Sequence, residues 1–283
     1  MHAVIAVDFH QNENKDFDEN SVRYLILNTI RANKVKFEKE FGQLVICCDA
    51  GNVWRRDVFP YYKFRRSENK KESLIDWNTI YKSFNKITEE LKEHFSFPVV
   101  HVDKCEGDDV IATLCQSFPD EKFLILSGDK DFVQLHTNPN VTQYSPVLKT
   151  PVVSDDPVRQ LRTLVLKGDI GDGCPSVFSA DNYLAIREKG QRSKPISEKM
   201  ITESLDDLDA FLNKYDVRRN FERNEQLIDL SKIPDECRSN ILEEFRIQRS
   251  KPKKNVLPYL INHKQRVLSE KVADFAYQER LDA

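Results

Sequence analysis

The stretch KCEGDDVIATLCQSFPDEKFLILSGDKDFVQLH, residues 104–136, places clustered acids directly beside apolar segments. Glu106, Asp108 and Asp109 precede VIATL, and Asp129 and Asp131 follow FLIL. Like charges repel, and the repulsion grows where water is partly excluded. Either these acids point separately into solvent, or a positive group binds among them.

Short apolar runs that end near an acid recur outward from this stretch. AVIAV precedes Asp8, QLVICC precedes Asp49 and KFLILS precedes Asp129, so each predicts a buried strand. Helical spacing of apolar residues separates them, at 21–32, 74–95 and 108–118. This alternation predicts an α/β fold with a mainly parallel central sheet and helices on both faces. The carboxyl ends of such strands meet at one edge, which would gather Asp8, Asp49 and Asp129 there.

The pattern changes near residue 150, where amphipathic segments separated by prolines begin. We therefore predict two domains, an α/β domain over 1–150 and a smaller, all-helical domain over 151–283.

Composition narrows the class of protein. The 283 residues carry a net charge of −3, and the six cysteines form no Cys-x-x-Cys pair, which favours reduced thiols over structural zinc. No apolar run is long enough to span a membrane, and MHAVIAVDF indicates a first strand instead of a signal peptide. We expect a cytoplasmic protein, and a monomer.

Nine acids in five segments are candidate metal ligands. A single acid at a strand end is usually a helix cap or a turn residue, as we expect for Asp103 and Asp120, but nine such residues favour a metal site. Oxygen ligands without His or Cys favour hard cations, Mg²⁺ or Mn²⁺. The candidates are Asp8, Asp49, Glu106, Asp108, Asp109, Asp129, Asp131, Asp169 and Asp172.

Several motifs resemble those of the 5′-nuclease (flap endonuclease) superfamily, in the same order: EGDDVIATL, ILSGDKDFVQL, VTQYSPV and LKGDIGDGCPSV. Further stretches, including WRRDVFPYYKFRR and LIDLSKIPDECRSNI, resemble its bacteriophage branch. The resemblance implies a two-metal enzyme that hydrolyses phosphodiesters from a 5′ end, removes RNA primers from RNA–DNA hybrids (ribonuclease H activity) and cleaves 5′ flaps. It also implies host-cell cytoplasm as the location if the chain is phage-encoded.

The resemblance also implies roles for the nine acids. Asp8, Asp49, Asp108 and Asp129 match the ligands of a first Mg²⁺ ion, and Asp131 and Asp172 match those of a second. Glu106, Asp109 and Asp169 match supporting acids that hold waters.

The basic segment at about 53–72 falls where the superfamily has an arch over its active site. Residues 55–71 contain seven bases and two acids, a surplus of five positive charges, with aromatic residues between them. This composition suits a threaded single strand, although a solvated loop is the alternative. By resemblance, Arg55 and Lys63 contact the scissile phosphate, Tyr62 stacks on a base, and Arg56, Arg65 and Arg66 bind nucleic acid.

KGDIGDGCPSVFSADNYLAIREKG, within 160–190, matches the superfamily's helix–turn–helix element for downstream duplex, with SVFS replacing a second glycine pair. Beyond it, Lys189, Arg192 and Lys194 are candidate phosphate contacts. The implied partners are branched or nicked DNA, RNA–DNA hybrid, a single-strand-binding protein and a sliding clamp. The alternatives are a catalytically silent nucleic-acid-binding protein of the same fold and a single-stranded ribonuclease.

Overall fold

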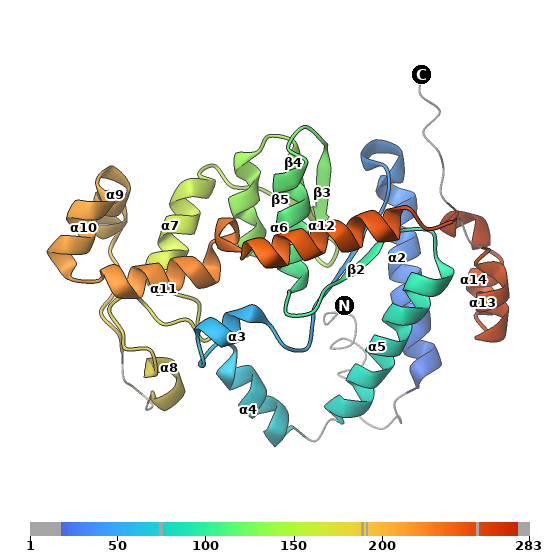
Figure 1. Cartoon of the computed structure of the whole chain (residues 1–283), viewed down its shortest axis with the longest axis horizontal. Coiled ribbons are helices and arrows are strands. Elements are labelled where there is room, and N and C mark those ends of the chain that lie inside the picture. The colour runs from blue at the N-terminus through green and yellow to red at the C-terminus, as the bar shows by residue number, and fades with distance from the viewer. Residues whose placement is uncertain (1–17, 74–75, 188–189, 191, 253–254, 277–283) are drawn as a thin grey trace. The chain divides into compact units, whose positions relative to one another are not determined.

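The structure of the chain is a computed structural model that describes residues 18–276, apart from 74–75, 188–189, 191 and 253–254 (Figure 1). Asp8, the first predicted strand and Lys189 lie outside the described residues. The chain divides into two compact units, and it passes between them within β1 (Ile46–Cys48), β2 (Val99–His101) and α12 (Asp235–Arg249). One unit comprises 1–46, 75–100 and 243–283, and the other 47–74 and 101–242.

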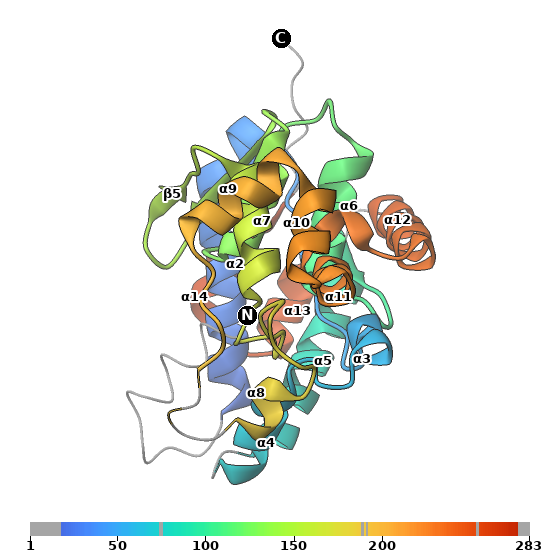
Figure 2. The same cartoon turned by 90° about the vertical axis from the view of Figure 1, so that its left-hand side faces the viewer.

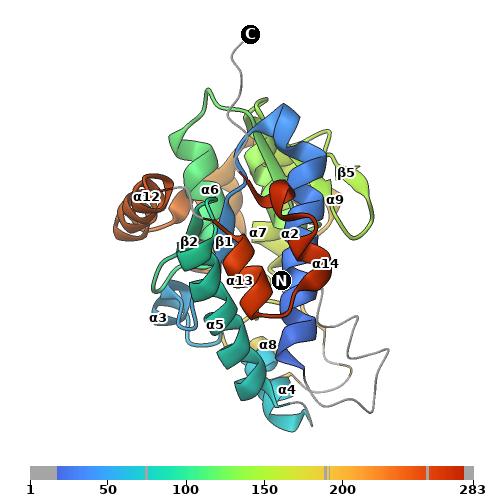
Figure 3. The ribbon, with the colours of Figure 1, turned by 90° about the vertical axis from the view of Figure 1, so that its right-hand side faces the viewer.

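The first unit is built on two long helices, α2 (Glu19–Phe41) and α5 (Trp77–His94). Asp18 and Asp76 cap their N-termini, and Gly42 ends α2 with a φ of 79°. Buried Arg23 of α2 donates to Glu90 of α5. The short C-terminal elements α13 (Leu257–Asn262), α14 (Arg266–Ser269) and η3 (Val272–Phe275) complete this unit (Figure 3).

The second unit contains a three-stranded sheet of order β3–β4–β5. Strand β3 (Phe123–Leu126) pairs in parallel with β4 (Val141–Ser145), which pairs antiparallel with β5 (Thr150–Val152). Beside it lie α6 (Gly107–Ser117) and the 3₁₀ helix η1 (Lys130–Thr137), which pack against each other. The sequence did not indicate β5, whose Pro151 is compatible with an edge strand.

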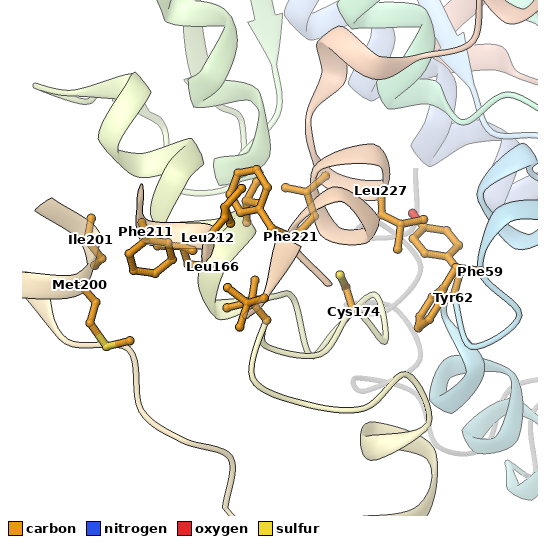
Figure 4. Packing of buried hydrophobic residues seen from close by; sticks show 14 of the residues in the cluster. Phe59, Tyr62, Leu166, Cys174, Met200, Ile201, Phe211, Leu212, Phe221 and Leu227 are labelled. Carbon is orange, nitrogen blue, oxygen red and sulfur yellow. The ribbon is translucent and has the colours of Figure 1, made fainter. Parts of the chain in front are cut away.

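The remaining elements of the second unit are helical (Figure 2). They are α3 (Trp54–Val58), α4 (Phe64–Glu72), α7 (Pro157–Lys167), α8 (Tyr183–Ile186), α9 (Glu198–Asp206), α10 (Leu208–Tyr215), α11 (Arg218–Ile228) and the 3₁₀ helix η2 (Leu230–Lys232). Helix α7 packs against α9 and α11, and α9 packs against α10. One hydrophobic core joins Phe59 and Tyr62 to residues of α7, α9, α10 and α11 (Figure 4). The predicted arch segment is thus anchored by apolar burial at its base.

In the part of the chain that the structure describes, no helix is both long enough and apolar enough to cross a membrane.

Candidate metal and nucleic-acid site

The end of β1 and the start of α6 meet at a short hydrogen bond. Asp49 directly follows β1, and its Oδ1 accepts the Gly107 N–H at 2.7 Å. A Cβ on Gly107 would lie 3.2 Å from the same oxygen, so the close approach favours glycine. This contact places Glu106, Asp108 and Asp109, at the beginning of α6, beside Asp49.

Arg55 lies buried beneath this corner, with 3% of its surface exposed. Its Nη1 donates to Glu106 at 2.9 Å, its Nη2 pairs with Asp109 at 2.8 Å, and its Nε donates to the Leu227 carbonyl at 2.9 Å. The sequence predicted that Arg55 contacts the scissile phosphate. The structure gives it a different setting, because each guanidinium nitrogen is already bound within the protein.

Asp109 belongs to the same buried cluster. It is 0% exposed and accepts hydrogen bonds from the Trp54 indole, from Arg55 and from the Glu106 N–H. Its carboxylate therefore anchors Arg55 and the first turn of α6. This buried setting, with its oxygens bound within the protein, differs from the water-holding role that the resemblance implies for Asp109.

Lys63 and Tyr62 reach the acids from the base of the arch. Lys63 has a left-handed backbone, with a φ of 54°; its Nζ donates to Glu106 and lies 3.8 Å from Asp172. The Tyr62 hydroxyl lies 2.8 Å from Glu106 and 3.0 Å from Asp172. The Tyr62 ring is only 4% exposed and packs in the core, a setting that differs from the predicted base-stacking role.

The segment 168–174, which we call the glycine loop, carries Asp169 and Asp172. Gly168 and Gly173 have φ values of 72° and 76°, and a Cβ on Gly173 would lie 2.4 Å from the Tyr61 carbonyl oxygen. The Asp172 carbonyl accepts the Lys63 N–H at 2.7 Å, and Arg66 binds the Asp172 carboxylate at 2.7 Å. The loop therefore lies against the base of the arch.

Asp129 and Asp131 lie at the beginning of η1. Asp129 follows β3 and caps η1, because its Oδ1 accepts the Asp131 N–H at 3.0 Å. Gln143 of β4 donates to the Asp129 carbonyl at 2.6 Å and so fixes this turn against the sheet.

Two of the acids have strongly perturbed pKa values. Burial, together with Glu106, Asp129 and Asp49, raises the pKa of Asp108 to about 7. Burial, together with Asp129, Asp169 and Asp172, raises the pKa of Asp131 to about 7. Asp129 is a neighbour of both, so the acids form two overlapping groups.

The pKa of Glu106 is shifted in the opposite direction. Burial acts to raise its pKa, but the adjacent Lys63 and Arg55 outweigh burial, and the pKa is lowered. Lys63 and Arg66 also oppose the effect of burial on Asp172, whose pKa nevertheless remains raised. Without a metal, Lys63 and Arg66 compensate part of the negative charge of the acid cluster.

A pocket opens where these segments converge, and acids from α6, η1 and the glycine loop line it together with residues of α11 and its end. Its lining comprises Arg55, Tyr62, Glu106, Asp108, Asp131, Asp169, Asp172, Cys174, Leu227, Ile228 and Leu230.

The residues fit a hard divalent cation. Carboxylate oxygens are its preferred donors, and the raised pKa values of Asp108 and Asp131 report burial and repulsion that a bound cation would offset. Within the described residues, no three Asp, Glu, His or Cys side chains already have the spacing of metal ligands. Glu106 and Asp172 are occupied by Lys63 and Arg66, and Asp8 lies outside the described residues.

The predicted nucleic-acid-binding residues that the structure describes lie in the same unit. Arg56, Arg65 and Arg66 of the arch are exposed, although Arg65 donates to the Leu184 carbonyl at 2.8 Å. Arg192 and Lys194 are exposed as well. The Lys194 Nζ lies 4.1 Å from the centroid of the Phe178 ring, which stabilises its position by a cation–π contact.

The sequence analysis missed polar residues outside the acid cluster that hydrogen-bond to the backbone near the acids. Gln134 and the adjacent pair Arg223 and Asn224 bind the backbone of acid-bearing segments or of α11. A signal was present for Asn224, because it stands three residues from both Phe221 and Leu227, on the apolar face of α11. A polar residue on such a face needs buried hydrogen-bond partners.

Comparison with known proteins identifies the class of protein to which this fold and acid cluster belong. Residues 3–161 match the family described as 5′-3′ exonuclease, N-terminal resolvase-like domain, and residues 157–275 match the T4 RNase H C-terminal family. The chain belongs to the 5′-3′ exonuclease family, and it is a 5′ nuclease. The predicted fold class, an α/β nuclease domain followed by helices, is confirmed, with small sheets in place of one large central sheet.

Among individual proteins, the chain is 34% identical to ribonuclease H of Enterobacteria phage T4 over 90% of this chain and 86% of that protein. It is 26% identical to a 5′-3′ exonuclease of Mycoplasmopsis pulmonis, over 65% of this chain and 61% of that one.

Solved structures share the fold. The T5 D15 protein co-crystallised with metal ions superposes with a TM-score of 0.59 at 18% identity, covering 88% of this chain and 97% of that one. The T5 D15 flap endonuclease in a pseudo-enzyme-product complex with DNA and metal ions gives a TM-score of 0.58 at 17% identity, with the same coverage of both chains.

Proposed function

We propose that this 5′ nuclease removes RNA primers from RNA–DNA hybrids and cleaves 5′ DNA flaps during replication, using two Mg²⁺ ions for which Mn²⁺ can substitute. The observation that carries the proposal is the pocket lined by acids of three segments, where burial and neighbouring carboxylates raise the pKa of Asp108 and Asp131. The phage T4 relative is a ribonuclease H, and the T5 neighbour is a flap endonuclease crystallised with DNA and metal ions.

In this proposal, Asp8, Asp49, Asp108 and Asp129 hold one ion, and Asp131 and Asp172 hold the other, with Asp169 supporting the second through water. When bound, such ions lower the pKa of a water and stabilise charge on the attacking and leaving oxygens. Glu106 supports the site by orienting Lys63 and Tyr62.

Lys63 is the residue that we propose contacts the scissile phosphate. Its ammonium group is at the acid cluster, and its side chain is 18% exposed, so a phosphate oxygen can replace Glu106 as its partner. Buried Arg55 acts indirectly in the proposal, because it fixes Glu106, Asp109 and the end of α11 in one arrangement.

The exposed bases of the arch, Arg56, Arg65 and Arg66, bind the backbone of the 5′ strand, and Lys189, Arg192 and Lys194 bind downstream duplex. Backbone phosphates dominate such affinity and carry no sequence information. Branched or nicked DNA and RNA–DNA hybrid are then the substrates. A single-strand-binding protein and a sliding clamp are further proposed partners, on resemblance alone.

A cleavage assay tests the proposal. Flap and RNA–DNA substrates labelled at the 5′ end or the 3′ end are incubated with Mg²⁺ or with EDTA. We expect release of short 5′ products in Mg²⁺ and none in EDTA. Binding of these substrates without cleavage in either Mg²⁺ or Mn²⁺ would instead support the catalytically silent alternative.

A further inference from the structure

We infer that Asn224 and Arg223 are positioning residues: from α11 they hold both ends of the glycine loop and thereby set Asp169 and Asp172 against the opposing acids. The inference rests on the proposed two-metal function, since Asp169 and Asp172 belong to the group assigned to the second ion. Neither residue enters the pocket lining, so their effect would be exerted through the loop.

The glycine loop has hydrogen bonds of its own. Asp169 accepts the Asp172 N–H on its carboxylate at 3.0 Å and the Cys174 N–H on its carbonyl at 2.7 Å, and the Ile170 carbonyl accepts the Gly173 N–H at 3.2 Å. Gly168 and Gly173 adopt φ values that carry little steric preference in glycine, so these positions restrain the unbound loop poorly. Its placement therefore also depends on contacts from outside the loop, which come from Lys63 and Arg66 on one side and from α11 on the other.

Asn224 supplies those contacts at the base of the loop. Its Nδ2 donates to the carbonyl of Val165, before the loop, at 2.8 Å, and to that of Pro175, after it, at 2.9 Å. Its Oδ1 accepts from the Cys174 thiol at 3.0 Å. The side chain is 0% exposed, and one amide thus ties together the two strands of chain that enter and leave the loop.

Arg223 completes the arrangement and fixes its orientation. Its Nε donates to Asn224 Oδ1 at 2.9 Å, so the amide nitrogen must face the two carbonyls. Its Nη2 donates to the Pro175 carbonyl at 3.0 Å, and its Nη1 pairs with Asp181 at 2.6 Å. All hydrogen-bonding capacity of the Asn224 amide is used, as a buried polar group requires.

Helix α11 and its end also contact the other acid-bearing segments. The Leu227 carbonyl accepts from Arg55, which binds Glu106 and Asp109 of α6. The Ile228 carbonyl accepts from Gln134 of η1 at 3.2 Å. Figure 4 shows Cys174 of the loop near the segment of α11 that carries Phe221 and Leu227. Hydrogen bonds therefore connect α11 to all three acid-bearing segments: the start of α6, η1 and the glycine loop. Asn224 makes the connection to the loop.

Loss of this link should weaken the second ion selectively. Residues that orient metal ligands typically change metal affinity by about 10–100-fold when replaced. We expect Asn224→Ala to raise the dissociation constant of one of two Mn²⁺ ions by about this factor and to leave the other unchanged. Arg223→Met should have the same direction of effect, because it frees the Asn224 amide to rotate.

Asn220 provides a matched control on the same helix. Its Nδ2 donates to the Val177 and Ser179 carbonyls at 2.8 Å and 3.3 Å, which is the same chemistry applied beyond the glycine loop. Its Oδ1 accepts from Arg223 Nη1 at 3.4 Å, but that nitrogen keeps its closer partner Asp181, at 2.6 Å, when Asn220 is replaced. Asn220→Ala should lower the thermal midpoint without changing either Mn²⁺ dissociation constant. Mn²⁺ binding is measured on the DNA-free protein by electron paramagnetic resonance, which counts free Mn²⁺ directly.

Cleavage supplies a second readout. Asn224→Ala should need about 10–100-fold more Mg²⁺ for half-maximal rate and should regain most of its turnover at saturating Mg²⁺, whereas a loss of folding would not be restored by metal. If Asn224→Ala does not fold, Asn224→Ser is compared with Asn220→Ser in the same way. Equal Mn²⁺ affinities in the Asn224 and Asn220 variants overturn the inference. Absence of Mn²⁺ binding by the wild-type protein overturns the proposed two-metal function instead.

Discussion

At the residue scale, Asp108 is one of two acids whose charged form is disfavoured by burial and by neighbouring carboxylates. Replacing it by Asn removes one ligand of the first proposed ion, and metal ions contribute several kcal/mol of transition-state stabilisation. Because 1.36 kcal/mol corresponds to a tenfold change in rate, we expect Asp108→Asn to lower cleavage by about 10³-fold or more. Rates are measured on a 5′-flap substrate at saturating Mg²⁺.

Folding should survive this change, because the variant removes a carboxylate that others repel. The control is Asp120→Asn, which removes an exposed acid in a turn and should leave the rate unchanged. A flap-cleavage rate for Asp108→Asn close to that of the control would show that this acid is not a metal ligand.

Replacing Lys63 should mainly affect turnover, whereas replacing Arg55 should mainly affect stability. Lys63→Ala should lower turnover by about 10²–10³-fold, the usual effect of removing one preorganised donor to developing charge, with little change in stability. Arg55→Ala leaves Glu106 and Asp109 without their buried cation and should cost about 3–5 kcal/mol of unfolding free energy. Single-turnover cleavage and urea unfolding separate the two effects.

Lys71→Ala is the control for charge, since Lys71 lies exposed on α4, where it pairs with Glu68. It should alter neither quantity by a large factor. If Arg55→Ala instead keeps wild-type stability and loses turnover, the sequence-based prediction of a direct phosphate contact for Arg55 is the correct one.

Sequence patterns at this scale identify the acids but not their partners. The types and spacing of Asp108, Asp129 and Asp131 indicated a cation site, because clustered acids require compensation. Whether an arginine in a basic segment faces a phosphate or a buried carboxylate depends on a contact with a residue far along the chain. Arg55 meets Leu227 across a separation of 172 residues, which no local pattern encodes.

At the element scale, the glycine loop tests how closely the arch base and the acids are coupled. Gly173→Ala places a Cβ at 2.4 Å from the Tyr61 carbonyl, and Gly42→Ala has nothing within 4 Å at a similar φ. Both variants carry the strain of a left-handed backbone, of the order of 1–3 kcal/mol. Only Gly173→Ala must also displace the loop, so it should lose more unfolding free energy and, unlike Gly42→Ala, much of its cleavage rate.

Urea unfolding and flap cleavage are measured for both variants. Equal losses of stability, with cleavage intact in Gly173→Ala, would mean that the loop can move away from Tyr61 without disturbing Asp172.

Elements with a strong apolar period were predicted well, and those held by tertiary contacts were not. The spacing at 74–95 predicted α5, observed over Trp77–His94, and that at 108–118 predicted α6, observed over Gly107–Ser117. Strand β5 has only three residues, one of them proline, and forms because β4 offers it an edge. The predicted arch contains two helices, α3 and α4. The predicted domain boundary near residue 150 stays a prediction.

At the scale of the whole molecule, the metal-free protein should lose stability as pH rises from about 4 to about 7. Asp108 and Asp131 have pKa values near 7 in the fold, against 3.8 as the ordinary value, so the folded state binds more protons in this window. Stability falls with pH wherever the folded state binds the additional protons. Below the window both states are protonated, and above it the full destabilisation is present.

Urea unfolding in EDTA between pH 5 and 8 measures this dependence. A double variant, Asp108→Asn with Asp131→Asn, removes both groups and should show a smaller decline than the wild-type protein. Saturating Mg²⁺ should also reduce the decline, because the ion binds the folded state. Parallel curves for the two proteins in EDTA would contradict the prediction.

Binding of a forked duplex is the second property of the whole molecule, and its salt dependence counts the phosphates contacted. Lys194 is held over the Phe178 and Tyr215 rings, Arg192 is exposed nearby in sequence, and Lys189 lies outside the described residues. Each phosphate contact contributes about 0.9 to the slope of log affinity against log salt. Replacing all three by Ala should flatten the slope by up to about 2.7.

The measurement is duplex affinity across a salt series in Ca²⁺, which is expected to support binding without cleavage. A charge-matched control replaces three exposed lysines of the other unit, Lys39, Lys82 and Lys271. Both variants lose three positive charges, so any general effect of net charge is the same in both. A difference between their slopes of log affinity against log salt therefore reports direct phosphate contacts. Cleavage at low salt should persist in both, because the acids and Lys63 are untouched. Equal slopes would mean that Lys189, Arg192 and Lys194 are merely solvated, and that other bases hold the downstream duplex.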